Sequence, residues 1–137
     1  MGLINPISGF NSSSEFTISG LPWVITASTS GISVVKYEFP KITKSITLHN
    51  LETSANKKIR VGFTANGVNG VNGNYYFCYD SGDLVVLDVR VKEIYIRADS
   101  SNTIPYSLYA SLTMIDDAQM PILTGSIDGQ TYWNGVG

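Results

Sequence analysis

The feature that most constrains the fold is an alternation of apolar and polar residues with a period of two, which runs from about residue 15 onward. It is clearest in residues 58–63, KIRVGF, where every second residue is apolar. Clusters of Gly, Asn, Asp, Ser and Pro interrupt the alternation every eight to twelve residues. Because successive side chains of a strand point to opposite faces of a sheet, this pattern is typical of antiparallel strands with one buried face.

Eight strands are predicted, and no segment shows helical periodicity. They cover residues 21–27, 32–39, 43–49, 58–64, 75–79, 84–91, 93–97 and 106–114. Short strands in this number suit two packed sheets, arranged either as a jelly roll or as an immunoglobulin-like Greek key. Since the strand count favours the jelly roll, we expect an all-β, single jelly-roll sandwich of eight antiparallel strands in two sheets.

The phase of the alternation predicts which side chains face the core. It slips by one residue at Lys92-Glu93, which indicates two separate strands or one strand with a bulge. The expected core residues are Ile59, Val61, Phe63, Val85, Leu87, Val89, Leu108, Ala110 and Leu112.

Length and composition indicate one domain. The 137 residues, 43% of them apolar, are enough to bury a core without metals or disulfides, so no cofactor is expected. We expect residues 1–14, rich in Gly, Ser and Asn, to form a flexible N-terminal arm and residues 15–137 to form the jelly-roll domain. The net charge of −2 argues against direct nucleic-acid binding. No apolar run approaches the roughly 20 residues needed to span a membrane, and the first residues do not resemble a secretion signal.

A nine-residue segment, Asn66–Asn74, contains three Asn-Gly pairs. Such pairs favour tight turns, so a surface loop before the fifth strand is expected. With little apolar area to bury, the loop is predicted to project from the sandwich and to contact a neighbouring copy, or else to be only a connection. The candidate subunit-contact residues are Asn66, Gly67, Asn69, Gly70, Asn72 and Gly73.

The residues that carry chemistry form no catalytic constellation, and no catalytic, cofactor-binding or metal-binding residue is predicted. His49 is the sole histidine and lies on the expected solvent face of a strand. The segment from Asp80 to Asp83 predicts a β-turn rather than a calcium-binding loop. Cys78, the sole cysteine, lies among aromatic residues and is expected to be a buried, unreactive thiol.

Two features bear on binding surfaces. Six of the nine basic residues lie between positions 36 and 60, and eight of the eleven acidic residues lie from Asp80 onward. This asymmetry can create complementary patches between neighbouring copies, and it can equally vanish once the strands interleave. Among the aromatic residues, Tyr109 and Trp133 are the candidates for exposure, Tyr109 because it shares a strand face with Ser and Thr residues.

Four segments carry a resemblance to a known family: KITKSITLHN at residues 41–50, RVGFTANGV at 60–68, LDVRVKEIYI at 87–96 and PILTGS at 121–126. Together they resemble the single jelly-roll penton (vertex) capsid proteins of nucleocytoplasmic large double-stranded DNA viruses. The resemblance covers roughly residues 41 to 126 and includes no site motif. It implies a non-enzymatic homopentamer in the virion, assembled in the host cell cytoplasm and in contact with neighbouring capsid proteins.

The leading hypothesis is therefore a structural virion protein, a penton or minor capsid subunit that self-assembles into a ring at icosahedral vertices. The alternative is a carbohydrate-binding β-sandwich of a lectin, adhesin or viral spike, in which Tyr109, Trp133 or Trp23 stacks on sugar rings.

Overall fold

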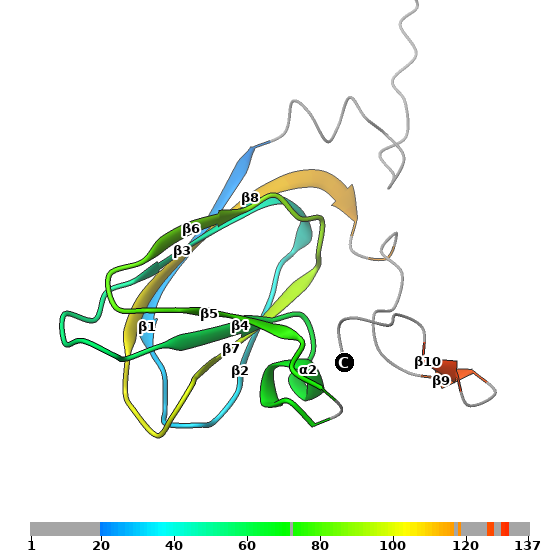
Figure 1. The fold of residues 1–137 in the computed structure, drawn as a ribbon. Helices are drawn as coiled ribbons and strands as arrows, with labels where there is room; N and C mark the ends of the chain where they lie inside the picture. The colour runs from blue at the N-terminus through cyan, green and yellow to red at the C-terminus, as the bar shows by residue number, and fades with distance from the viewer. Residues whose placement is uncertain (1–19, 72, 117, 119–125, 128–129, 132–137) are drawn as a thin grey trace, which may run out of the picture.

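Eight strands form two four-stranded antiparallel sheets that face each other in the computed structural model (Figure 1). The structure describes residues 20–71, 73–116, 118, 126–127 and 130–131. Its elements are β1 (Leu21–Ser28), β2 (Val35–Glu38), β3 (Lys41–Asn50), β4 (Ile59–Gly62), α2 (Ala65–Asn69), β5 (Tyr76–Tyr79), β6 (Leu84–Leu87), β7 (Glu93–Ala98), β8 (Pro105–Asp116), β9 (Ser126–Ile127) and β10 (Gln130–Thr131). The expected N-terminal arm, residues 1–14, lies outside the described residues.

The strand order is that of a jelly roll. One sheet has the order β1-β8-β3-β6 and the other has the order β2-β7-β4-β5, so the chain passes repeatedly from one sheet to the other. Strands β9 and β10 form a separate two-stranded antiparallel pair. The prediction of a single jelly-roll sandwich with eight antiparallel strands is confirmed.

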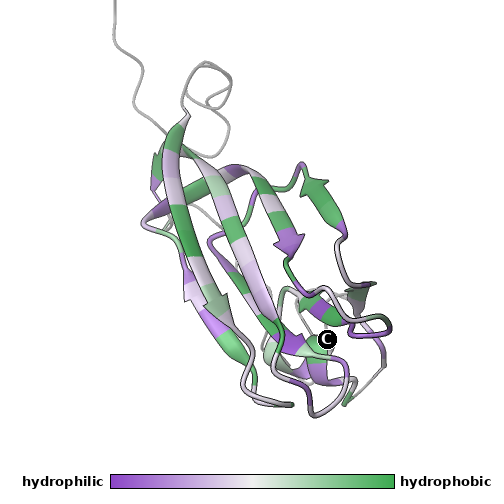
Figure 2. Cartoon of the chain, turned by 90° about the vertical axis from the view of Figure 1, so that its left-hand side faces the viewer, coloured by the Kyte–Doolittle hydropathy of each residue, from purple (hydrophilic) through white to green (hydrophobic). Residues whose placement is uncertain are grey.

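The core fills the space between the two sheets. Five of the nine predicted core residues are buried, and Phe63, Val85, Leu87 and Val89 are partly buried and pack against them. Figure 2 shows the alternation of hydrophilic and hydrophobic residues along the strands that produces this arrangement. The predicted strand phase is therefore correct, although Phe63 is less buried than a central core residue.

The phase slip at Lys92-Glu93 separates two strands, but the first of them is shorter than predicted. Strand β6 ends at Leu87 instead of residue 91 because the following backbone bonds to Thr43, where β3 departs from regular register. The Thr43 hydroxyl donates to the Val89 carbonyl at 2.7 Å and accepts from the Val91 amide at 3.0 Å. Polar and apolar residues continue to alternate in residues 88–91, although this segment is not part of a strand.

The Asn-Gly segment was expected to be a loop with little packing, and this prediction is wrong for its first half. Residues Ala65–Asn69 form the short helix α2, capped by Thr64, whose hydroxyl accepts from the Gly67 amide at 2.9 Å. Gly70 ends the helix in the left-handed conformation (φ 72°). Val68 is 0% exposed. Packing therefore stabilises a helix that the composition disfavours.

Candidate functional site

Twelve residues on the outward side of the sheet β1-β8-β3-β6, none of them Lys, Arg, Asp or Glu, form a surface that we call the sheet face. The ion pair of Lys41 and Asp116 lies beyond its end, where the start of β3 pairs with the end of β8. Registers place Val24 opposite Tyr109, Tyr109 opposite Thr47, and Thr47 opposite Val86, so one row of uncharged residues crosses all four strands. The sheet face consists of Pro22, Val24, Thr26, Ser28, Ser45, Thr47, His49, Leu84, Val86, Ser107, Tyr109 and Ser111.

Several members of the sheet face are apolar and unusually exposed. Val24 is 70% exposed, and Leu84 and Val86 are exposed as well. Thr26 and Ser107 hydrogen-bond to each other through their hydroxyl oxygens, 3.0 Å apart. Val24 and Val86 lie on the two edge strands of this sheet, with Tyr109 and Thr47 between them. Large contiguous exposed apolar patches mark interaction sites.

The outward side of the other sheet, β2-β7-β4-β5, carries two groups of ion pairs. Lys36 lies 2.8 Å from Glu38 and 3.2 Å from Glu93, and Arg60 lies 2.7 Å from Asp99. In each pair the residues come from the same molecule, so the strands interleave basic and acidic residues. Lys36 and Glu93, and likewise Arg60 and Asp99, lie far apart in the sequence but are neighbours in the structure.

Helix α2 lies on this charged sheet and not in the main core. Gly62 faces α2, and a Cβ atom at Gly62 would lie 3.2 Å from the Cβ of Val68, so glycine permits the close approach. Arg60 donates to the Val68 carbonyl at 3.2 Å, and Arg97 donates to the Asn69 side chain at 2.9 Å. These contacts fix the position of α2 on the sheet.

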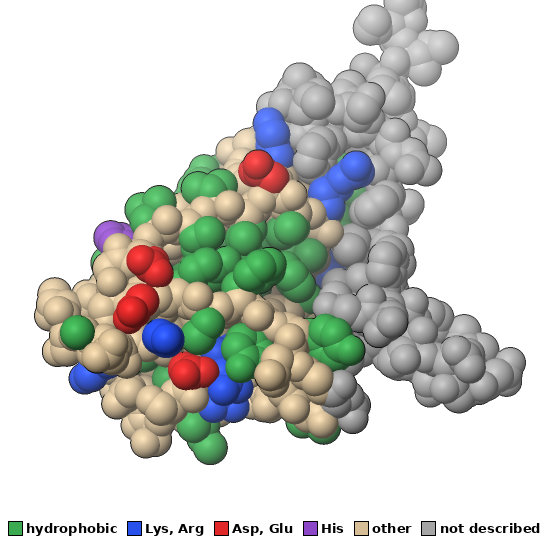
Figure 3. Space-filling view, viewed as in Figure 1, with side chains coloured by type: hydrophobic (Ala, Val, Ile, Leu, Met, Phe, Trp, Pro, Cys, Tyr) green, Lys and Arg blue, Asp and Glu red, His purple; other side chains and the backbone are tan. Residues whose placement is uncertain are grey.

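On the lateral side of the sandwich between β5 and β6, hydrophobic side chains that pack on the core are partly exposed. Strands β5 and β6 are the edge strands of their sheets, and the turn from Asp80 to Asp83 joins them. In Figure 3, seen from the side of Figure 1, hydrophobic side chains gather between β6 and β5. We call this surface the open edge; it consists of Phe63, Phe77, Tyr79, Val85, Leu87 and Val89.

Phe77 shows how the open edge arises. It lies opposite Val61, which is buried, so its side chain points to the inner side of the sheet. Nevertheless Phe77 is 53% exposed, because β5 is the edge strand of its sheet and no described strand pairs with its outer edge. Its ring stacks on Tyr79 with centroids 6.2 Å apart.

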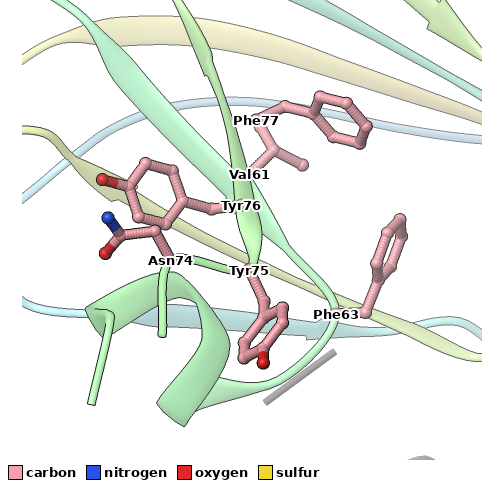
Figure 4. Close-up of a pocket in the computed structure, with 6 residues that line it drawn as sticks. All are labelled: Val61, Phe63, Asn74, Tyr75, Tyr76 and Phe77. Atoms are coloured by element: carbon pink, nitrogen blue, oxygen red, sulfur yellow. The ribbon is translucent and has the colours of Figure 1, made fainter. Parts of the chain in front are cut away.

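A pocket of about 230 Å³ lies at one end of the open edge, lined by Val61, Phe63, Asn74, Tyr75, Tyr76 and Phe77. We call it the aromatic pocket. Figure 4 shows the rings of Phe63 and Phe77 on one side of β5 and the ring of Tyr76 on the other. Its volume is below the range of about 300–1,000 Å³ that is usual for small-molecule sites. A space of this size suits one or two apolar side chains of a partner.

The candidate subunit-contact residues of the Asn-Gly segment divide into two groups. Gly67 is buried and Asn69 accepts a hydrogen bond from Arg97, so both help to attach α2. Asn66 is exposed, Gly70 is the C-cap of the helix and Gly73 is exposed with φ 135°. Asn72 lies outside the described residues.

Cys78 is exposed on β5, so the prediction of a buried thiol is wrong. All other residues in 75–79 are aromatic, so the sequence does not show which face of this strand is buried. The register places Cys78 opposite Arg60, on the outer, charged side of the sheet. Partial burial raises the pKa of the thiol, and the negative charge of Asp99 raises it further. A raised pKa makes the thiol a poor nucleophile at neutral pH.

The aromatic candidates have different environments. Tyr109 is 39% exposed on the sheet face, as predicted. Trp23 packs edge-on against Tyr37 and Phe39, with ring centroids 5.7 and 5.0 Å away, so it is not available to stack on a ligand. Trp133 lies outside the described residues.

Sequence reasoning missed Val24, Leu84 and Val86 as members of an exposed surface. A signal was present, because residues 21–25, LPWVI, and residues 84–87, LVVL, are apolar on both strand faces. A strand that is apolar on both faces is typical of strands that are covered on both sides.

The described part of the chain offers no group of three or more His, Cys, Asp or Glu that could hold a metal. His49 lies half-buried on the sheet face, opposite Leu84 and Ser107. Within the same residues, no helix is long and apolar enough to cross a membrane. Comparison with protein-family models gives no match, and comparison with curated proteins gives none either.

Proposed function

We propose that the protein is a structural subunit that assembles with copies of itself into a closed ring. The observation that carries this proposal is the sheet face, which has no Lys, Arg, Asp or Glu and on which Val24, Leu84 and Val86 are exposed. The outward side of the other sheet carries the ion pairs of Lys36 and Arg60. Self-association removes such a surface from water at no cost in buried charge.

The resemblance to penton proteins supplies the rest of the proposal. It implies a ring of five copies, a place at the vertices of a virion shell assembled in the host cytoplasm, and contacts with neighbouring capsid proteins. This role requires no catalytic group, metal or cofactor.

Size-exclusion chromatography with light scattering tests the ring. The expected mass is five times the 14.9 kDa of the chain, and negative-stain images should show five-fold rings. Because the proposed surface is uncharged, raising the salt from 0.1 to about 1 M should not dissociate the ring. A 14.9 kDa species at every protein concentration and salt concentration would refute the proposal.

A substitution with a matched control ties the assembly to the sheet face. Val24→Lys places a charge at its most exposed apolar position and should shift the protein to monomers, whereas Ile32→Lys, at an exposed apolar residue in the turn before β2, should leave the ring intact. Lysine is well tolerated on an edge strand such as β1, so folding should be preserved in both variants. Equal dissociation by the two variants would contradict the assignment.

Carbohydrate binding is the second candidate, and one observation favours it. Tyr109 is an exposed aromatic ring flanked on the sheet face by the hydroxyls of Thr47 and Ser107. Rings with neighbouring hydroxyls are suited to neutral sugars. A glycan array with the wild type and Tyr109→Ala tests it: binding that the variant loses supports this candidate, and no binding by the wild type removes it.

A further inference from the structure

We propose that Arg97 and Arg60 form a binding site for a tetrahedral oxyanion, such as inorganic phosphate, where helix α2 lies on the outward side of β4 and β7. The site is separate from the sheet face and the open edge, and it does not depend on self-assembly. Three features of Arg97 support it: its lack of a counter-charge, its fixed orientation and its contact with solvent.

Arg97 is a buried cation that forms no ion pair with a described residue. It is 9% exposed, and its guanidinium donates to two neutral acceptors, the Ala98 carbonyl at 2.8 Å and the Asn69 side chain at 2.9 Å. Asp99, whose negative charge also acts on Arg97, pairs with Arg60 instead, at 2.7 Å. Buried charges in proteins are normally paired, so a counter-charge for Arg97 is missing.

Arg60 places a second positive charge beside Arg97. The two residues are directly opposite each other in β4 and β7, and both point outward because their neighbours along each strand are buried. Cβ atoms of such a pair lie about 5 Å apart, and like charges there repel each other. Burial lowers the pKa of the Arg97 guanidinium and the charge of Arg60 lowers it further, but an arginine stays protonated at neutral pH. An anion that binds both guanidinium groups offsets this repulsion and supplies the missing counter-charge.

The acidic residues around the two arginines do not cancel their charge. The Cys78 thiol is influenced by Asp99, Lys58 and Arg60 together, so these three charged groups share one neighbourhood. With the buried arginine, they make three cations and one carboxylate. Asp80, the next acidic residue after β5, accepts a backbone hydrogen bond within its own turn. A positive charge therefore remains for an anion.

The guanidinium of Arg97 is held in one orientation and still contacts solvent. Its Nε and Nη1 groups donate to Ala98 and Asn69, which leaves Nη2 without a partner among the described residues. No side-chain nitrogen or oxygen in this part of the chain is both buried and unpartnered, so Nη2 is accessible to solvent. Asn69 is itself exposed, which leaves an approach to Arg97 beside α2.

Arg60 is held in a similar way. Its Nε donates to Asp99 at 2.7 Å, its Nη1 donates to the Val68 carbonyl at 3.2 Å, and its Cζ lies 4.3 Å from the centre of the Tyr76 ring. Its Nη2 also has no partner among the described residues and so is accessible to solvent. Because both guanidinium groups are ordered before an anion arrives, binding costs little side-chain entropy, and their planar shape matches the oxygens of phosphate.

Thermal unfolding of the full chain in inorganic phosphate, followed by tryptophan fluorescence, tests the site. At an ionic strength kept constant with sodium chloride, the melting temperature should rise with phosphate, by about 8 °C at about a hundredfold excess over Kd. Lys36→Gln removes a cation from the same sheet outside the site and should show the same rise, whereas Arg97→Gln should show none. If the wild type gains nothing over sodium chloride alone, or if Arg97→Gln responds equally, the proposal is wrong.

A second pair of variants keeps Arg97 in place and decides the question if Arg97→Gln does not fold. Asn69→Asp supplies a carboxylate at the position that already accepts a hydrogen bond from Arg97, with almost no change in shape. It should raise the melting temperature without phosphate and abolish the response to phosphate. Asn66→Asp adds the same charge at an exposed position of α2 and should keep the response. A full response in Asn69→Asp would overturn the proposal.

Other anions define the ligand chemistry. Sulfate should raise the melting temperature as phosphate does, whereas acetate should raise it less, because it carries a single charge and two oxygens. A larger rise with acetate would contradict the assignment to a tetrahedral oxyanion. These results are independent of the proposed function: a chain that stays monomeric by light scattering but responds to phosphate refutes the ring and supports this site.

Discussion

Truncation of Val68 tests whether α2 is part of the folded subunit or only a connection. Val68→Ala removes two methyl groups from a side chain that is 0% exposed and packs over Gly62. Lost burial costs about 0.8 kcal/mol per group, or about 1.6 kcal/mol in total. The cavity left between α2 and the sheet adds up to about 1 kcal/mol, so we expect a loss of about 2.5 kcal/mol in the free energy of unfolding.

The control is Val71→Ala, three residues further along the chain. Val71 is 62% exposed, so the same truncation should cost less than about 0.5 kcal/mol. Both substitutions keep the backbone carbonyl that accepts from Arg60 at position 68, so the comparison isolates side-chain packing.

The assay is equilibrium urea unfolding followed by the fluorescence of the tryptophans. Each variant is made in the Val24→Lys background, because assembly would add its own stabilisation to the folded state. The urea midpoint should fall for Val68→Ala with an unchanged slope, and the melting temperature should fall by about 10 °C. If Val68→Ala and Val71→Ala cost the same, α2 does not pack on the sheet, and the segment is the loop that its composition predicts.

Three further predictions concern the core, a tyrosine pair and the cysteine. Leu108→Ala, at a fully buried position between the sheets, should cost about 2–5 kcal/mol in urea unfolding, whereas Ser107→Ala, next to it on the sheet face, should cost less than about 1 kcal/mol. Burial and the 2.5 Å hydrogen bond with the Tyr37 hydroxyl raise the pKa of Tyr106, so the neutral phenol stabilises the folded state at pH values below the unfolded-state pKa of about 10. The free energy of unfolding, measured at successive pH values, should therefore fall above about pH 10. Tyr106→Phe should reduce this fall. Cys78 should react completely with Ellman's reagent in the native protein, but more slowly than free cysteine, because partial burial and Asp99 raise the pKa of its thiol. Asp99→Asn should make the reaction faster. A thiol that reacts only after denaturation would contradict the exposed position of Cys78.

The local pattern of the sequence determined the strands and the inward-facing residues. All eight predicted strands are present, because alternation of side chains along a strand is a property of neighbouring residues and does not depend on the partner strand. The predictions were wrong where contacts with a distant segment changed the local secondary structure. Thr43 draws the backbone after Leu87 out of the ladder, and Gly62, Arg60 and Arg97 hold α2 in a segment whose composition disfavours helix.

The apolar segments LPWVI and LVVL signalled part of the candidate site, but only the tertiary structure brought its residues together. Val24, Tyr109, Thr47 and Val86 lie far apart in the sequence and become one row only when the strands adopt the order β1-β8-β3-β6. The same order leaves β5 and β6 as edges and so exposes Phe77. Period-two alternation determines which side of a strand is buried, but the order of strands depends on pairing between remote segments, and this order decides which exposed side chains become neighbours.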